Sequence, residues 1–454
     1  MTDNWLPVLS PASGVKYQAI ADALGAAIET GELRSGDRLP PQRELAARLG
    51  VDLTTITRAY ETARQRGLIE PRGRAGSFVR APRPIGPREL AQIDPGMNAP
   101  PELPGGILAR HLSETASALL LDERIRTLQY RPAGGTAGDR AAGAAMMADL
   151  GLPADEQQIV VTAGGQNALH AILAANFEPG DRIACGAHVY PGFRSLAERL
   201  KLCLVPLPEM GAEALANAHR EAPVSALYLV PTNDNPTTAT VPLAEREALA
   251  ALAASQGIRI IEDDAYGALP AEPIPPIASL APELGWYIAS TSKLISPALR
   301  VAFVRAPSIA AALRLAGDVH ETTIMAPPLN VAIVGEWIRN RTFARLLSAM
   351  RAETRRRQAL ARDLLAGLDY RSHEEGYHGW LGLADEVDAA SVEAVARRTG
   401  LTLIPSSRFA VGPSPSHALR VSLGGHLDMA ELADGLRLLH GYATDRSFKA
   451  APLV

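Results

Sequence analysis

The feature that most restricts the fold is a regular alternation of short apolar runs with longer Ala- and Leu-rich segments in the centre of the chain. The apolar runs have the length of buried strands and lie at residues 159–161, 182–185, 227–230, 258–261, 287–289 and 301–304. Strands that alternate with helical segments predict an α/β fold with a largely parallel sheet. Such sheets bind ligands at the carboxyl ends of their strands, so the residues that follow each run are the first candidates for a site.

Length and composition fit a globular protein of several domains. The chain has 454 residues, of which 47% are hydrophobic and 21% charged, and its formal net charge is -4. About three domains are expected at this length. Residues 1–80 hold 11 Lys and Arg against 9 Asp and Glu, so a basic bias is confined to the N-terminal part.

The sequence predicts a cytoplasmic protein without a metal site. No run approaches the ~20 apolar residues of a membrane span, and the first residues lack the pattern of a signal peptide. Cys185 and Cys203 both lie in apolar runs, which indicates reduced thiols in the core. The histidines at positions 170, 320, 373, 378 and 417 do not have the spacing of metal ligands.

The N-terminal eighty residues have the pattern of a winged helix-turn-helix. Three helices are predicted, the second over residues 42–49 after Pro41 and the third capped by Asp52. Residues 68–70 and 77–79 then predict a two-stranded wing with a basic, glycine-containing tip. A helical interaction module with solvated charges is the alternative.

A proline-rich stretch divides the chain after residue 80. Residues 81–106 contain seven prolines and predict a semi-rigid linker, long enough to carry the N-terminal module onto a neighbouring subunit. The second domain is expected over residues 107–445. From about residue 350, a helix and three further apolar runs predict a smaller α+β part of that domain.

Lys293 follows an apolar run, in the segment Ala289-Ser290-Thr291-Ser292-Lys293. An isolated lysine is usually exposed. Here, however, the preceding predicted strand ends in Asp263, with Tyr266 three residues later. An amine to form a Schiff base, a carboxylate to keep a ring nitrogen protonated and a hydroxyl for a ring phenolate are the groups that pyridoxal 5'-phosphate (PLP) requires. The sequence therefore predicts a PLP site.

Three further strand ends carry residues suited to the same cofactor. Gly164 and Gly165 open a helix whose N-terminus can bind phosphate, although these glycines taken alone favour a plain turn. Tyr190 offers a ring for stacking or merely for packing. Asn235 precedes a proline as many turn residues do, and its amide can also donate to a phenolate. Asp263 itself has an alternative role as a helix cap.

These residues and their spacing resemble those of a known family. Residues 107–445 resemble fold-type I aminotransferases, through the motifs Asp263-x-x-Tyr266 and Ser290-x-x-Lys293-x6-Arg300. With its N-terminal module, the whole chain resembles the MocR subfamily of GntR-type transcriptional regulators. The resemblance implies a winged helix-turn-helix, a large PLP-binding domain with a mixed, mostly parallel sheet, and a small α+β domain.

The resemblance also implies a role for each residue that matches a motif. Lys293 would carry the Schiff base, Asp263 would pair with the pyridine nitrogen and Tyr190 would stack on the ring. Asn235 and Tyr266 would bond the ring phenolate. The phosphate would be held by Gly164, Gly165, Gln166, Ser290 and Arg300.

Two more positions follow from the resemblance. Tyr130 matches a tyrosine that reaches the partner's phosphate in aminotransferase dimers, so a homodimer with a shared site is implied. Arg420 matches the arginine that binds the α-carboxylate of a substrate as a planar fork. An ordinary exposed arginine is the alternative for Arg420.

In the N-terminal module, the resemblance places a set of residues where GntR-type winged helices touch DNA. Thr54 and Thr55 begin the third helix, whose first turn would enter the major groove. Leu53 and Thr57 stand where related proteins often have arginine, which puts guanine recognition there in doubt. The implied DNA contacts are Arg43, Thr54, Thr55, Arg58, Arg72, Gly73 and Arg74.

These observations favour a PLP-dependent regulator that binds operator DNA and senses an amino acid or amine through condensation with the cofactor. An active aminotransferase with an auxiliary DNA-binding domain is the alternative, because the residues from Asp263 to Arg420 form a complete catalytic set. The winged helix favours regulation, since an enzyme does not need one. A structural dimer without PLP leaves Lys293 unexplained.

Overall fold

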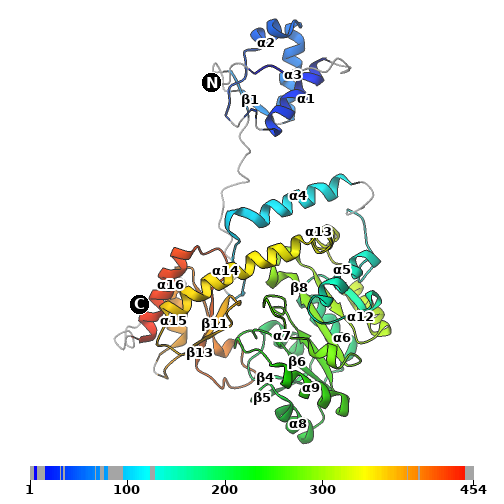
Figure 1. Cartoon of the computed structure of the whole chain (residues 1–454), viewed down its shortest axis with the longest axis vertical. Helices are drawn as coiled ribbons and strands as arrows, with labels where there is room; N and C mark the ends of the chain where they lie inside the picture. The colour runs from blue at the N-terminus through cyan, green and yellow to red at the C-terminus, as the bar shows by residue number, and fades with distance from the viewer. Residues whose placement is uncertain are drawn as a thin grey trace. The chain divides into compact units, whose positions relative to one another are not determined.

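The computed structural model describes residues 5–7, 16–30, 32–33, 36–66, 68–71, 76–79, 96–122, 128–385, 387–396 and 399–444. The chain divides into two compact units, Met1–Ile93 and Asp94–Val454, each of which has its own core (Figure 1).

The smaller unit is a winged helix-turn-helix, as predicted. Its elements are α1 (Lys16–Glu29), α2 (Gln42–Leu49), α3 (Leu53–Gln65), β1 (Ile69–Pro71) and β2 (Ser77–Val79). Gly50 ends α2 in the left-handed conformation, and Asp52 begins α3 by accepting a hydrogen bond from the Thr54 amide at 2.8 Å. The antiparallel strands β1 and β2 form the predicted wing. The residues at its tip, Arg72, Gly73 and Arg74, lie outside the described residues.

The larger unit is built on a seven-stranded sheet of order β3-β9-β8-β7-β6-β4-β5. Only β9 runs antiparallel to its neighbours, so the sheet is mixed and mostly parallel, as predicted. The strands are β3 (Ile159–Thr162), β4 (Arg182–Gly186), β5 (Cys203–Leu207), β6 (Ala226–Leu229), β7 (Arg259–Asp263), β8 (Gly285–Ser290) and β9 (Ala302–Arg305).

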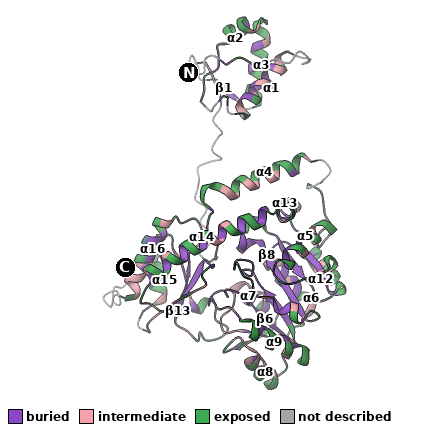
Figure 2. Ribbon diagram, in the orientation of Figure 1, coloured by how far each residue is buried: buried purple, intermediate pink, exposed green. Residues whose placement is uncertain are grey.

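Both faces of this sheet are covered, and Figure 2 shows its central strands as buried. Along β6, Tyr228 packs into one hydrophobic core, whereas Leu227 and Leu229 pack into the other. The helices of this part of the unit are α4 (Ile107–Leu121), α5 (Ala137–Ala148), α6 (Gly165–Asn176), α7 (Pro191–Arg199), α8 (Ala212–Glu221), α9 (Leu243–Gln256), α10 (Ile277–Leu280), α11 (Thr291–Leu294), α12 (Ile309–Thr323) and α13 (Pro328–Arg339).

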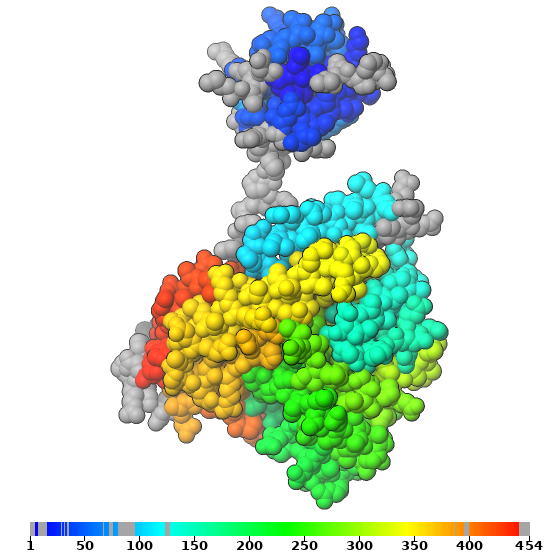
Figure 3. Space-filling view, in the orientation of Figure 1, coloured from blue at the N-terminus to red at the C-terminus, as the bar shows by residue number. Residues whose placement is uncertain are grey.

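The smaller, C-terminal part of this unit has an antiparallel sheet of order β10-β11-β13-β12. Its elements are α14 (Thr342–Leu364), β10 (Tyr370–Ser372), β11 (His378–Gly382), α15 (Ala389–Ala396), β12 (Thr402–Pro405), β13 (Ala418–Ser422) and α16 (Met429–Thr444). The long helix α14 packs against α13 and also against α16, and in Figure 3 it lies on the surface beside α4 (Figure 3).

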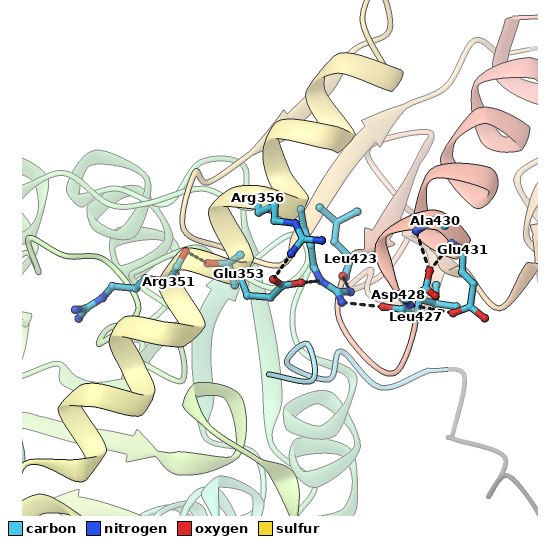
Figure 4. A network of polar contacts seen from close by, with 10 residues as sticks. Arg351, Glu353, Arg356, Leu423, Leu427, Asp428, Ala430 and Glu431 are labelled. Atoms are coloured by element: carbon cyan, nitrogen blue, oxygen red, sulfur yellow. Dashed lines mark hydrogen bonds and ion pairs between the residues drawn. The ribbon is translucent and has the colours of Figure 1, made fainter. Parts of the chain in front are cut away.

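A buried polar network ties α14 to the loop after β13 (Figure 4). Arg357 pairs with Glu353 at 2.7 Å and donates to the carbonyl oxygens of Leu423 and Leu427. Both charged side chains are nearly inaccessible, and each is paired, which is what makes their burial tolerable. This loop therefore has a fixed position relative to α14.

The structure differs from two expectations. Residues 96–106, which the prolines assigned to the linker, belong to the larger unit, because Asn98 and Leu103 are buried there. The 3-10 turn Pro104–Gly106 leads directly into α4. Cys185 is buried as expected, whereas Cys203 is exposed, because it begins β5, the edge strand of the sheet. Within the described residues, none of the helices is both long and apolar enough to span a membrane.

Candidate functional site

The carboxyl ends of the parallel strands surround one pocket, which we call the strand-end pocket. The register of β7 with β8 places Asp263 opposite Ile288, so the segments that follow both strands lie at the same sheet edge. Nine of the residues predicted for the cofactor line this pocket, namely Gly165, Gln166, Tyr190, Asn235, Asp263, Tyr266, Ser290, Lys293 and Arg300.

Asp263 ends β7 and is 7% exposed. Its carboxylate accepts a hydrogen bond from the Tyr228 hydroxyl at 3.1 Å, and a turn rather than a helix follows it, so Asp263 is not a helix cap. Burial raises the pKa of Asp263 to about 6, which means that a neighbouring cation would stabilise its charged form. A protonated ring nitrogen is such a cation.

Lys293 lies in the short helix α11, immediately after β8. Its ammonium group donates to the carbonyl oxygen of Asn98 at 2.6 Å. Burial, assisted by the positive charge of Arg420, lowers the pKa of Lys293 to about 8. About a tenth of the amine is therefore uncharged at pH 7, far more than for an ordinary lysine, and the uncharged form is the one that attacks a carbonyl.

A cradle suited to an anion lies at the start of α6. Gly164 has a φ of 86°, and a Cβ at this position would lie 3.0 Å from the Arg300 guanidinium. A side chain here would therefore fill the space between the glycine turn and Arg300. The first amides of α6 have no acceptors within the helix, and the helix dipole favours negative charge at this end. The buried Ser292 hydroxyl has no hydrogen-bond partner among the described residues and can donate to the same anion.

Tyr190 precedes α7 and its half-buried ring lines the strand-end pocket. A Cβ at Gly192 would lie 2.4 Å from this ring and 2.6 Å from the Gln166 side chain. The ring and the amide can thus occupy their positions only because residue 192 is glycine. Gln166 also donates to the Gly192 carbonyl at 3.2 Å.

Tyr266 and Asn235 also line the pocket, whereas Arg420 does not line it and lies buried behind Asn235. Arg420 on β13 is 2% exposed, and it donates to the Asn235 side-chain oxygen at 3.0 Å. This contact leaves the Asn235 NH₂ group to face a phenolate. The guanidinium lies over the Phe409 ring, 5.1 Å from its centroid. Burial lowers the pKa of Arg420 to about 10, so the group remains charged at neutral pH. It is not an ordinary exposed arginine.

These features fit PLP. A buried carboxylate that could pair with a protonated ring nitrogen and a lysine amine line the same pocket, and a helix N-terminus with Arg300 could receive the phosphate. Several buried polar atoms without partners among the described residues also line or border the pocket. They are Gln166 Oε1, Ser292 Oγ, Asn98 Oδ1 and Arg420 Nε.

Tyr130 lies apart from the other predicted residues. It is 80% exposed and does not line the strand-end pocket. Its predicted contact belongs to a second subunit.

Sequence reasoning missed Asn98, Tyr228 and His378. Tyr228 lay in an apolar run, where a hydroxyl that needs a buried partner was the available signal. Asn98 lay in the proline-rich stretch assigned to the linker. His378 is fully buried on β11, and nothing in its sequence neighbourhood distinguished it from the other histidines.

The surface of the smaller unit carries the predicted DNA contacts of α2 and α3. Arg43, Thr54 and Arg58 are exposed, and Thr55 is half-buried. The Thr54 hydroxyl already donates to Asp52 at 2.6 Å. A base would therefore meet Thr54 only through its remaining acceptor capacity.

Both units match known families. The model for aminotransferase class I and II matches residues 118–438, and that for bacterial regulatory proteins of the gntR family matches residues 16–79. The uncharacterized HTH-type transcriptional regulator YdeF of Bacillus subtilis is 31% identical over 97% of both chains. The HTH-type pyridoxine biosynthesis transcriptional regulator PdxR of Corynebacterium glutamicum is 25% identical over 90% of this chain and 94% of its own.

A solved structure connects the larger unit with PLP chemistry. The α-aminoadipate aminotransferase LysN of Thermus thermophilus, complexed with N-(5'-phosphopyridoxyl)-L-leucine, is similar at 25% identity with a TM-score of 0.68, over 76% of this chain and 90% of that one. The aminotransferase family uses PLP. The chain therefore belongs to the aminotransferase class I and II family and, with its gntR-family helix-turn-helix, it is a DNA-binding transcriptional regulator of the MocR type.

Proposed function

We propose that the protein regulates transcription in response to an amino acid or amine that enters the strand-end pocket and reacts with PLP. The observation that carries this proposal is the burial of Arg420 directly behind Asn235, one of the residues that line the strand-end pocket. In the described residues, its hydrogen-bond acceptors are an amide oxygen and a main-chain carbonyl, both uncharged. A buried guanidinium without an anionic partner is stabilised by a ligand that brings a carboxylate.

The residues of the pocket have separate tasks in this proposal. Bound PLP supplies an aldehyde that condenses with primary amines. Lys293 offers its uncharged amine, and Asp263 holds a proton at the ring nitrogen. Asn235 and Tyr266 donate hydrogen bonds to the phenolic oxygen, while the start of α6 and Arg300 neutralise the phosphate.

We further propose a homodimer in which Tyr130 completes the site of the other subunit and the segment before residue 96 crosses between subunits. Support comes from the exposure of two large apolar side chains that precede Tyr130 in the sequence, which a partner would cover. Leu121 is 83% exposed and Leu128 is 76% exposed. Light scattering at micromolar concentration tests this, and a stable monomer with full cofactor affinity would refute the shared site.

The second candidate is a working aminotransferase with an auxiliary DNA-binding unit. The amine of Lys293, whose pKa is about 8, favours it, because such a group can both accept and donate a proton near neutral pH. Turnover and sensing are therefore compatible within one site.

A titration distinguishes the two roles. Amino acids and amines are added to the PLP-loaded protein with and without its promoter DNA, while cofactor absorbance, keto-acid formation and DNA affinity are recorded. Sensing predicts a ligand that changes both absorbance and DNA affinity. An enzyme without a sensory role predicts keto-acid formation with unchanged DNA affinity. No absorbance change with any compound would refute the proposed function.

A further inference from the structure

A short segment at the start of the larger unit lies against the strand-end pocket. Residues 96–98 are the first described residues after the stretch that leads from the winged helix-turn-helix. Met97 lines the pocket, and Asn98 is 2% exposed. This segment therefore joins the ligand site to the chain that carries the DNA-binding unit.

The main-chain carbonyl of Gly96 is bound to one nitrogen of the Arg420 guanidinium. The Nη2 group of Arg420 donates to the Gly96 carbonyl oxygen at 2.9 Å, whereas Nη1 is bound to Asn235. The Nε group has no partner among the described residues, although it is buried. A carboxylate that binds Arg420 as a fork needs two adjacent N–H groups, so it would take Nη2 together with Nε. The Gly96 carbonyl holds the place of one of its oxygens.

Asn98 attaches the segment to both parts of the larger unit. Its side-chain NH₂ donates to the Tyr266 hydroxyl at 3.0 Å and lies 3.2 Å from Nδ1 of His378. The other ring nitrogen of His378 lies 2.9 Å from the Asp234 carbonyl oxygen, which can only accept a hydrogen bond. Nε2 therefore carries the proton, and Nδ1 accepts from Asn98.

The residues that follow are anchored separately. Gly425 donates to the Pro100 carbonyl and accepts from the Glu102 amide, both at 3.2 Å. Ala99 approaches so closely that a Cβ at Gly424 would collide with its carbonyl oxygen. The anchor lies on the loop after β13, the strand that also carries Arg420. Residues 96–98 can thus leave the pocket while residues 99–102 keep their place.

We propose that residues 96–98 form a latch that competes with the carboxylate of the effector for Arg420, and that release of this latch changes how the DNA-binding unit is tethered. The proposal rests on the proposed function, because it assumes that the effector binds at Arg420. It names the effector as an amine that also bears a carboxylate. An amine without that group can react with the cofactor but leaves Gly96 on Arg420, and so it does not release the latch.

The competition has a measurable consequence. A latch that holds the closed form reduces the apparent affinity for the effector by the closed-to-open ratio. Removal of the two side-chain hydrogen bonds of Asn98 should tighten effector binding by about 5- to 30-fold. Without effector, it should also shift the DNA affinity toward the value that effector produces in the wild type.

Hydrogen exchange of the amides of residues 96–98 in the full-length, PLP-loaded protein tests the latch directly. Without ligand, Asn98→Ala and Arg420→Ala should each accelerate this exchange by about 10-fold. Glu102→Ala is the matched control, because Glu102 is exposed and only its main chain joins the anchor. Asn98→Ser replaces Asn98→Ala if the latter does not fold. Unchanged exchange in folded Asn98 and Arg420 variants would overturn the latch.

A second experiment adds ligands in pairs, each an L-amino acid and the amine that remains when its carboxylate is removed. L-alanine and ethylamine are the first pair, and any other L-amino acid that changes the cofactor absorbance is tested in the same way. The amino acid should accelerate exchange at residues 96–98 by about 10-fold, and the matched amine should not. If the amino acid changes the absorbance and the exchange stays constant, the latch is wrong although the sensory site stands. If no amino compound changes the absorbance, the proposed function itself fails, and the effector role of the latch fails with it.

Discussion

The strand-end pocket and the DNA-facing surface of α2 and α3 show two ways in which residues form a site. In the pocket, residues at the ends of β3, β4, β6, β7 and β8 meet because these parallel strands all end at one edge of the sheet. On the surface of the smaller unit, Arg43, Thr54 and Arg58 are exposed side chains of two adjacent helices. The buried residues of the pocket therefore shift one another's pKa values before any ligand binds. The exposed side chains of α2 and α3, in contrast, have a function only when DNA is bound.

The largest effect is expected at Lys293, because the pocket offers one amine. The chain has four lysines, and the other three are Lys16, Lys201 and Lys449. Lys293→Ala should abolish the PLP adduct that borohydride traps, as measured by mass spectrometry. Lys201→Ala is the control, since Lys201 is exposed. A normal adduct in the Lys293 variant would place the site elsewhere.

The second-largest effect is expected at Arg420, and it distinguishes the role of the pocket from that of the DNA-facing surface. Arg420→Ala should weaken a carboxylate effector by about 2–5 kcal/mol, because it removes a buried, charge-assisted fork. The DNA affinity of this variant without effector is measured in the same isotherms at fixed salt. Release of the latch should shift it toward the affinity that the wild type shows with effector bound. A full effector response in this variant would show either that the effector lacks a carboxylate or that the pocket is not the sensor.

Most of the pocket was predictable because strand ends can be located from apolar runs. Lys293, Asp263 and Tyr266 follow such runs directly, and the resemblance assigned the remaining residues. The residues that the sequence did not reveal are brought to the pocket by packing between distant parts of the chain. Asn98 lies 195 residues from Lys293 and 280 from His378, and no local periodicity encodes those contacts.

The smaller unit shows the reverse relation. Its helices were predicted nearly to the residue because Pro41, Gly50 and Asp52 mark their ends. The contact that Thr54 makes with its own cap was not predicted, since a threonine hydroxyl can satisfy either the helix terminus or a base. Local structure was thus easier to predict here than the availability of a particular side chain.

On the DNA surface, Thr54 and Thr55 should govern which operator is preferred. Thr55→Ala should change the relative affinity for operator variants by about 1–3 kcal/mol, the amount expected when a side chain no longer reads a base edge. Thr54→Ala should have a smaller effect, because its hydroxyl is partly committed to Asp52. Thr62→Ala, the same substitution near the other end of α3, is the control. Equal preferences in all three variants would show that these residues do not read bases.

The pH dependence of cofactor uptake tests whether the pocket acts before ligand binding. A protonated lysine has no lone pair, so uptake by the PLP-free protein should accelerate as pH rises and level off above the pKa of Lys293, which burial lowers to about 8. Between pH 7 and 8 the rate should rise about fivefold. Stopped-flow absorbance measures it, with butylamine in solution as the reference. An inflection near that of butylamine would mean that the pocket does not perturb the amine.

The smallest effect is expected at the wing tip, which the sequence assigns to DNA contacts. Arg72→Ala and Arg74→Ala should each weaken binding to all sequences alike, because a phosphate contact carries no base information. Each substitution should reduce the slope of log affinity against log salt concentration by about 1. Arg437→Ala is the control, as this exposed arginine lies on α16 of the larger unit and pairs with Asp434. Binding isotherms at several salt concentrations give the slope for each protein. If the slope is unchanged while operator preference shifts, the wing reads bases, and the division between a base-reading helix and a phosphate-binding wing is wrong.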